Sequence, residues 1–146
     1  MTPSAARRWI SFATCAWALA FAAPHTWWAL GVSAGFPGGE DGYYLFMSSS
    51  WRFAYDLFVV FLSAVGFVVA LVLLRPAQRV PRRWLPHTLA WIACALLSLR
   101  GLAGLIVDGG SDLIWWPVFL LGGILYGLVA WLARAPHVSR ALANSS

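Results

Sequence analysis

Three ionisable side chains stand inside runs of residues that are otherwise suited to lipid, and they are the residues best placed to do chemistry. Arg100 lies within the third apolar run, His25 near the end of the first and Asp56 near the start of the second. A guanidinium at membrane depth costs from about 3 to more than about 10 kcal/mol, so it normally faces a partner or a water-filled cavity. The three residues therefore predict a polar pocket or a set of ion pairs between apolar segments.

The composition indicates a membrane protein. The chain has 146 residues, of which 61% are hydrophobic and 10% charged, with a mean hydropathy of +0.74, whereas soluble domains carry roughly 25% charged residues. Four apolar runs are each long enough to cross a hydrocarbon core of about 30 Å. We expect an all-α integral membrane four-helix bundle that forms a single domain over residues 1–146, with spans at about 10–30, 53–74, 88–107 and 113–132.

The distribution of charge predicts the orientation of these spans. All five acidic residues fall on one side of a four-span topology, with Arg52, and most arginines fall on the other. By the positive-inside rule we expect both termini to be cytoplasmic and the long loop to be external. We expect the membrane to be the plasma membrane. The ten basic residues are all Arg, which is typical of a GC-rich bacterial genome. The arginines on the predicted inner side are Arg7, Arg8, Arg75, Arg79, Arg82, Arg83, Arg134 and Arg140.

Two segments at the predicted outer side leave alternatives open. Ala20-Phe21-Ala22 is a plausible signal-peptidase site after a basic start, but the apolar run continues to Leu30, so we expect the first span to be retained.

The segment 31–52 is long for a connector. Its second half is rich in Tyr and Phe, which favours an interfacial loop over a lid.

Small residues predict close helix packing in the third and fourth spans. Ala90, Cys94, Ser98 and Gly101 recur at helical spacing, and Gly123 and Gly127 form a Gly-x-x-x-Gly pair. Such faces let helix backbones approach, within one chain or between copies. Cys15 and Cys94 fall at different depths, so we interpret both as buried small residues and not as a disulfide or metal pair.

The rise of an α-helix places the three ionisable groups at similar depths. Arg100 lies about 11 Å, His25 about 8 Å and Asp56 about 5 Å below the outer ends of their spans. We therefore predict that Arg100 pairs with Asp56 and that His25 forms hydrogen bonds between them. The alternatives are a static salt-bridge cluster or local partners. With local partners, Arg100 would reach a lipid phosphate or pair with Asp108 or Asp112. His25 would form a hydrogen bond with a nearby backbone carbonyl, and Asp56 would pair with Arg52.

Other chemistries lack the residues that they need. No metal-ligand spacing, phosphate loop or nucleophile-base pair is present, so we predict no catalytic residue, metal or cofactor. Haem ligation by two histidines fails because His25 and His87 lie near opposite surfaces. The sequence lacks a basic face with interleaved aromatic residues, so it gives no indication that the protein binds nucleic acid. Quinone binding stays open, because Trp27, Trp28, Trp115 and Trp116 border the outer region.

Two short motifs stand in the first and third runs. The first reads His25-Thr26-Trp27-Trp28-Ala29-Leu30-Gly31, and the second reads Leu99-Arg100-Gly101-Leu102-Ala103-Gly104-Leu105. With these motifs the chain resembles a family of small bacterial four-span membrane proteins of unknown function. That family carries His-x-x-Trp-Ala-Leu-Gly in its first helix and an Arg-Gly pair in its third. The resemblance implies that His25, Trp28, Gly31 and Arg100 belong together as a set.

These observations favour one function and leave a second open. We expect an outer-leaflet polar pocket, built on His25, Trp28, Asp56 and Arg100, that binds a lipid-like or small ligand or docks a partner subunit. The alternative is a membrane enzyme or redox accessory that acts on a quinone or isoprenoid-type substrate with His25 as proton carrier. The expected partners are the lipid bilayer and either a second copy of the chain or another membrane subunit.

Overall fold

The structure is a computed structural model that describes residues 3–36, 39–75, 82, 84–107 and 115–134. All regular structure in these ranges is helical, which confirms the predicted all-α class. The helices are α1 (Pro3–Ala29), α2 (Gly39–Met47), α3 (Ser50–Leu74), α4 (Trp84–Val107) and α5 (Trp115–Arg134). The four predicted spans coincide with parts of α1, α3, α4 and α5. Three residues at the ends of the predicted spans are exceptions: residue 30 follows α1, and residues 113 and 114 lie outside the described residues.

Several helices extend beyond the apolar runs for local reasons. Proline is favoured at the start of a helix because its missing N–H needs no partner there, and α1 begins at Pro3 while α4 has Pro86 in its first turn. The prediction of a loop between the first two spans missed α2. Glu40 and Asp41 stand in the first turn of α2, where negative charge is stabilised by the helix dipole.

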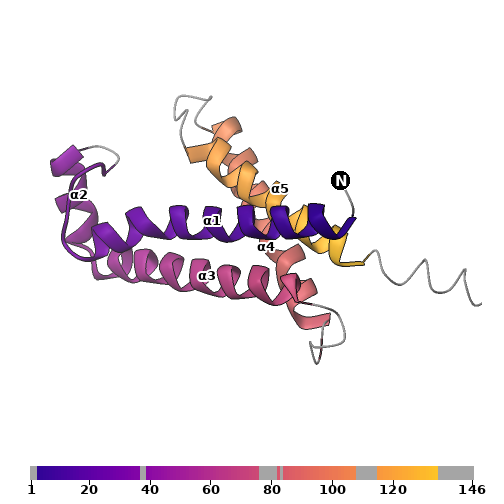
Figure 1. Cartoon of the computed structure of the whole chain (residues 1–146). Coiled ribbons are helices and arrows are strands. Elements are labelled where there is room, and N and C mark those ends of the chain that lie inside the picture. Colours follow the sequence, from indigo (N-terminus) through magenta and orange to yellow (C-terminus); the bar gives the residue numbers. More distant parts are fainter. Residues whose placement is uncertain (1–2, 37–38, 76–81, 83, 108–114, 135–146) are drawn as a thin grey trace, which may run out of the picture.

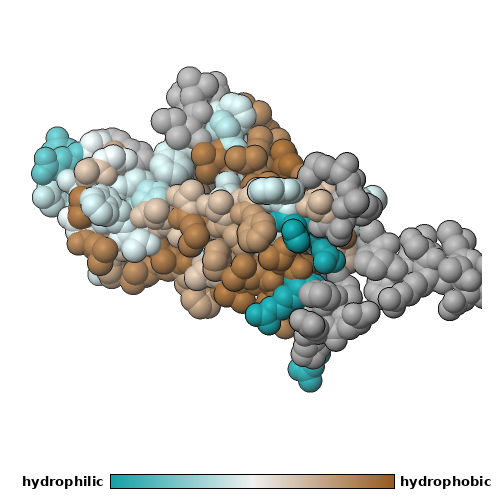
Figure 2. All heavy atoms as spheres, in the orientation of Figure 1, coloured by the Kyte–Doolittle hydropathy of each residue, from teal (hydrophilic) through white to brown (hydrophobic). Residues whose placement is uncertain are grey.

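Three helices of the described residues are long and apolar enough to cross a membrane, namely α3, α4 and the Trp115–Ala133 part of α5. Helix α1 has ample length but is less apolar, since it contains Pro24 and His25 and buries the polar residues Ser11 and Thr14. The visible face of the molecule is hydrophobic along the middle of the helices and hydrophilic around α2 and at the opposite end (Figure 2). These features fit a membrane protein.

The long helices form two antiparallel pairs that cross each other (Figure 1). α1 packs mainly on α3, and α4 packs mainly on α5. A Cβ atom added to Gly123 would lie 3.2 Å from the carbonyl oxygen of Cys94 and would collide with Ser98, and one added to Gly127 would lie 3.0 Å from the Cys94 sulfur. The small-residue faces of α4 and α5 therefore meet within one chain.

The hydrophobic core lies toward one end of the molecule, where α3 ends and α4 begins. Its fully buried residues come from the last turns of α3 and α5 and the first turns of α4: Val69, Leu73, Ala90, Tyr126, Val129, Ala130 and Ala133. Toward the other end the two pairs diverge (Figure 1). Both cysteines are free, and Cys15 is buried while Cys94 is half-buried, in keeping with small packing residues.

Candidate functional site

His25 and Asp56 form a close polar pair at the end of the molecule where the helix pairs diverge. Because α1 and α3 are antiparallel, the last turns of α1 lie beside the first turns of α3, and His25 Nδ1 is 2.6 Å from Asp56 Oδ1. An ionised carboxylate can only accept hydrogen bonds, so Nδ1–H donates to Oδ1. The pair orients the imidazole and leaves its Nε2 atom for another partner.

Aromatic rings surround the imidazole. The ring centroids of Phe21, Trp28 and Trp115 lie 5.1, 5.2 and 6.3 Å from that of His25. Trp28 is buried and is held by a hydrogen bond from its indole N–H to the Ala34 carbonyl oxygen, at 3.3 Å. The Tyr43 hydroxyl of α2 donates to the Trp28 carbonyl oxygen at 3.0 Å. Tyr43 thus joins α2 to the Trp28 end of this aromatic cluster, and the His25 side chain is 13% exposed.

The second carboxylate oxygen of Asp56 is a buried polar atom without a partner among the described residues. Asp56 is only 2% exposed, and a buried acceptor that lacks a hydrogen bond costs roughly 1–3 kcal/mol, more when it is charged. Oδ2 is therefore able to accept a hydrogen bond from a donor that the described part of the protein does not supply.

Arg100 does not form the predicted pair with Asp56. In the described residues the ion-pair partner of Asp56 is His25, while the Arg100 guanidinium carbon lies 5.2 Å above the centre of the Phe119 ring, a cation–π contact. The physical reason is that α4 pairs with α5, which carries Phe119, and diverges from α3. Pairing with Asp108 or Asp112, the alternative for Arg100, lies outside the described residues.

The local alternative for Asp56 is also not what the structure contains. Arg52 donates a hydrogen bond to the Leu45 carbonyl oxygen at 3.3 Å, and its guanidinium lies 5.7 Å from the Phe46 ring centre. Arg52 therefore ties the start of α3 to α2 and leaves Asp56 to His25.

His25 and Arg100 line one cleft from opposite helix pairs, although they do not touch. The cleft has a volume of about 510 Å³ and lies between the α1–α3 and α4–α5 pairs. The ring centroids of Phe119 and Phe21 are 5.3 Å apart. Because Arg100 lies over Phe119 and His25 lies beside Phe21, these two rings link the two polar residues. The remaining lining is mostly aliphatic and aromatic: Trp17, Tyr55, Phe58, Val59, Leu62, Ser63, Val65, Gly66, Val69, Leu89, Ile92, Ala93, Leu96, Leu97 and Tyr126.

The aromatic wall of this cleft was missed by reasoning from the sequence. Trp17 stacks on Phe21 with ring centroids 5.0 Å apart and donates its indole N–H to the Val118 carbonyl oxygen at 3.1 Å, which joins α1 to α5. A signal was present, because Trp17, Phe21, His25 and Trp28 recur every three or four residues and so share one face of a helix. The contribution of Phe119 had no comparable signal.

The described residues contain no group of three or more His, Cys, Asp and Glu side chains that could hold a metal ion. The His25–Asp56 pair offers two such ligands, fewer than the four or more of structural metal sites. The chemistry that the arrangement can perform is therefore hydrogen bonding and proton exchange at Nε2, together with attraction of negative charge by Arg100.

Comparisons with protein-family models, curated proteins and solved structures found no match for this chain. The resemblance to small four-span bacterial proteins accordingly stays a prediction that rests on the two motifs. What the fold defines is a class: an all-helical protein with three helices able to cross a membrane and a cleft between two helix pairs.

Proposed function

We propose that this protein is a bacterial plasma-membrane protein that crosses the bilayer four times with both termini in the cytoplasm. The fourth span would be α1, whose 27 residues exceed the roughly 20 needed to cross the hydrocarbon core and which packs along α3. The charge distribution supports the orientation, because all five acids then lie outside and most arginines inside. In this orientation the end of the cleft that holds His25 and Arg100 lies in the outer half of the membrane.

The function that the geometry supports best is binding of a lipid-like or other small amphipathic ligand in that cleft. The observation that carries this proposal is an apolar cleft of about 510 Å³ with a cation and an oriented imidazole on its walls. Ligand pockets typically measure roughly 300–1,000 Å³ and combine apolar walls with a few polar groups. Apolar parts of the ligand would contact α3 and α4, and its polar group would meet Arg100 and His25.

The two polar residues would play different parts in such binding. Arg100 is exposed and is held by an aromatic face, so its guanidinium N–H groups remain able to donate to an oxygen of the ligand. His25 is fixed by Asp56, so its Nε2 accepts from a hydroxyl when neutral and donates to a carbonyl when protonated. A ligand with an oxygen-containing head and an apolar body satisfies both groups.

A second candidate is a membrane enzyme or redox accessory that acts on a quinone or isoprenoid-type substrate. The observation that favours it is the His25–Asp56 pair, since a carboxylate that orients an imidazole is a common arrangement for proton transfer. His25 would pass a proton through Nε2 while Asp56 stabilises the imidazolium. Docking of a partner membrane subunit into the cleft is the third use of the same surface.

Filling the cleft tests ligand binding directly. Leu96 and Leu99 are both exposed on α4, at 60% and 64%, but only Leu96 lines the cleft. We expect Leu96→Trp to lower the amount of small molecule recovered by solvent extraction of the purified protein, measured by mass spectrometry. The matched Leu99→Trp variant should retain the wild-type amount. Equal recovery from both variants would refute a ligand in this cleft.

The identity of the recovered molecule separates the candidates. A quinone in the extract, seen by its ultraviolet absorbance and mass, favours the redox reading, and His25→Gln should then slow its reduction or oxidation more than its retention. A saturated or anionic lipid favours simple binding. Co-purification of a defined membrane protein that is lost with Leu96→Trp, with no small molecule, would instead support subunit docking.

A further inference from the structure

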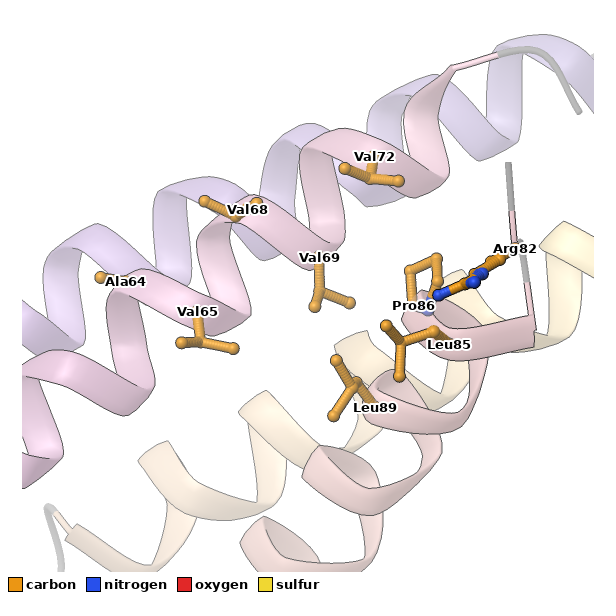
Figure 3. Close-up of a pocket in the computed structure, with 9 residues that line it drawn as sticks. All are labelled: Ala64, Val65, Val68, Val69, Val72, Arg82, Leu85, Pro86 and Leu89. Carbon is orange, nitrogen blue, oxygen red and sulfur yellow. The ribbon is translucent and has the colours of Figure 1, made fainter. Parts of the chain in front are cut away.

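A second hollow lies between α3 and α4, near the end of α3 and the start of α4. It has a volume of about 530 Å³ and, apart from one residue, its lining is apolar: Ala64, Val65, Val68, Val69, Val72, Leu85, Pro86 and Leu89. Figure 3 shows Val65 and Val69 of α3 facing Leu85 and Leu89 of α4 across an open space. We call this hollow the α3–α4 groove. It belongs to the end of the molecule opposite the His25–Asp56 pair.

Arg82 is the only charged residue that lines the groove within the described part of the chain. It is exposed, and its side chain extends from the turn toward Pro86 at the end of the groove (Figure 3). Its φ of 54° lies in the left-handed region that non-glycine residues rarely adopt. The Arg82 carbonyl oxygen accepts a hydrogen bond from Leu85 N–H at 3.0 Å, which anchors this conformation to the first turn of α4.

We propose that the α3–α4 groove binds an acyl chain of an anionic phospholipid whose phosphate pairs with Arg82. A phosphate oxygen matches the planar guanidinium, which binds it through two parallel hydrogen bonds. The apolar walls match the acyl chain, because between surfaces that lie among lipid tails it is van der Waals packing that favours one apolar contact over another. Phospholipid is also the ligand present at the highest concentration around such a groove.

Charge decides between a phospholipid and a second copy of the chain as the occupant. Arg82 attracts a negative partner, but the acids of the described residues lie in α2 or in the first two turns of α3, at the other end of the helix pairs, and the remaining two acids follow α4 in the sequence. The described residues of a second copy in the same orientation would therefore bring Arg75 or Arg82 and no carboxylate side chain to this end. An anionic headgroup brings the missing charge.

The groove is separate from the proposed outer cleft although the two share a wall. Val65, Val69 and Leu89 line both, but the cation of the groove is Arg82 and that of the cleft is Arg100. The inference therefore goes beyond the proposed function, and a test on Arg82 does not depend on what the cleft binds.

The test uses the full-length protein in mild detergent, exposed to an equimolar mixture of phosphatidylglycerol and phosphatidylcholine, with bound lipids counted by native mass spectrometry. We expect the wild-type protein to retain phosphatidylglycerol in preference to phosphatidylcholine. Arg82→Gln should lower this preference about fivefold, the effect of one basic residue near anionic lipid. Arg52→Gln, which removes an exposed arginine from the opposite end, should leave the preference unchanged.

A second pair of variants tests the groove itself. Val68 and Leu71 are both exposed on α3, but only Val68 lines the groove. Val68→Trp should lower retention of both lipids, and Leu71→Trp should not. An unchanged lipid preference in Arg82→Gln, or an equal loss in Arg52→Gln, would overturn the proposal. So would a Val68→Trp protein that retains lipid normally but changes its oligomeric state, because the occupant would then be a second copy.

Discussion

Energetic coupling between His25 and Asp56 is the sharpest consequence of the structure. Their side chains are 13% and 3% exposed and are joined by one hydrogen bond of 2.6 Å with a charged acceptor. Hydrogen bonds to charged groups contribute about 1.5–3 kcal/mol. We expect a double-mutant cycle of His25→Ala and Asp56→Ala to give a coupling energy of about 2 kcal/mol in the free energy of unfolding.

The single variants should differ in an informative way. Asp56→Ala removes the partner of His25, but it also removes the cost of the buried unpartnered Oδ2 atom, so its effect should not exceed the coupling energy by much. Asp56→Asn keeps an oxygen that can accept from Nδ1–H and should cost only about 1 kcal/mol. An Asn variant as destabilised as the Ala variant would mean that charge, and not hydrogen bonding, holds the pair.

The assay is reversible unfolding of the full-length protein in mixed micelles of rising denaturing-detergent content, followed by helical circular dichroism. Ser63→Ala is the control, because Ser63 is also buried on α3 but its hydroxyl donates to the Val59 carbonyl oxygen of its own helix at 2.9 Å. Loss of that local bond should cost less than about 1 kcal/mol. A His25–Asp56 coupling energy below about 0.5 kcal/mol, the usual error of additivity, would refute the pair.

Two further predictions concern the frame around the site. Gly123→Val should destabilise the protein by about 1–3 kcal/mol in the same assay, because the added side chain would meet Ser98 and the Cys94 carbonyl oxygen and separate α4 from α5; a stability equal to wild type would exclude this close approach. Tyr43→Phe should cost about 1 kcal/mol and speed hydrogen exchange of the α2 amides, since the hydroxyl donates to the Trp28 carbonyl oxygen. Exchange at wild-type rates would mean that the hydroxyl does not hold α2.

The amino-acid sequence was sufficient to predict the four long helices. Uninterrupted apolar runs between basic and glycine-rich segments leave few alternatives to a helix, because a chain in lipid must satisfy its backbone hydrogen bonds within each segment. The helix α2 was missed, since its nine residues carry no long apolar pattern. The common depth of His25 and Asp56 also followed from the sequence, because depth depends only on the helix rise and the order of the helices.

Which side chains meet was decided by tertiary structure. Depth along a helix does not specify rotation about its axis or the tilt of one helix pair against another, and these two variables brought Asp56 to His25 and Arg100 to Phe119. The rotation of α4 is set by the close approach of Cys94 and Ser98 to Gly123. That contact between small residues directs α4 toward α5, so that Arg100 lies over the Phe119 ring of α5 and does not form an ion pair with Asp56.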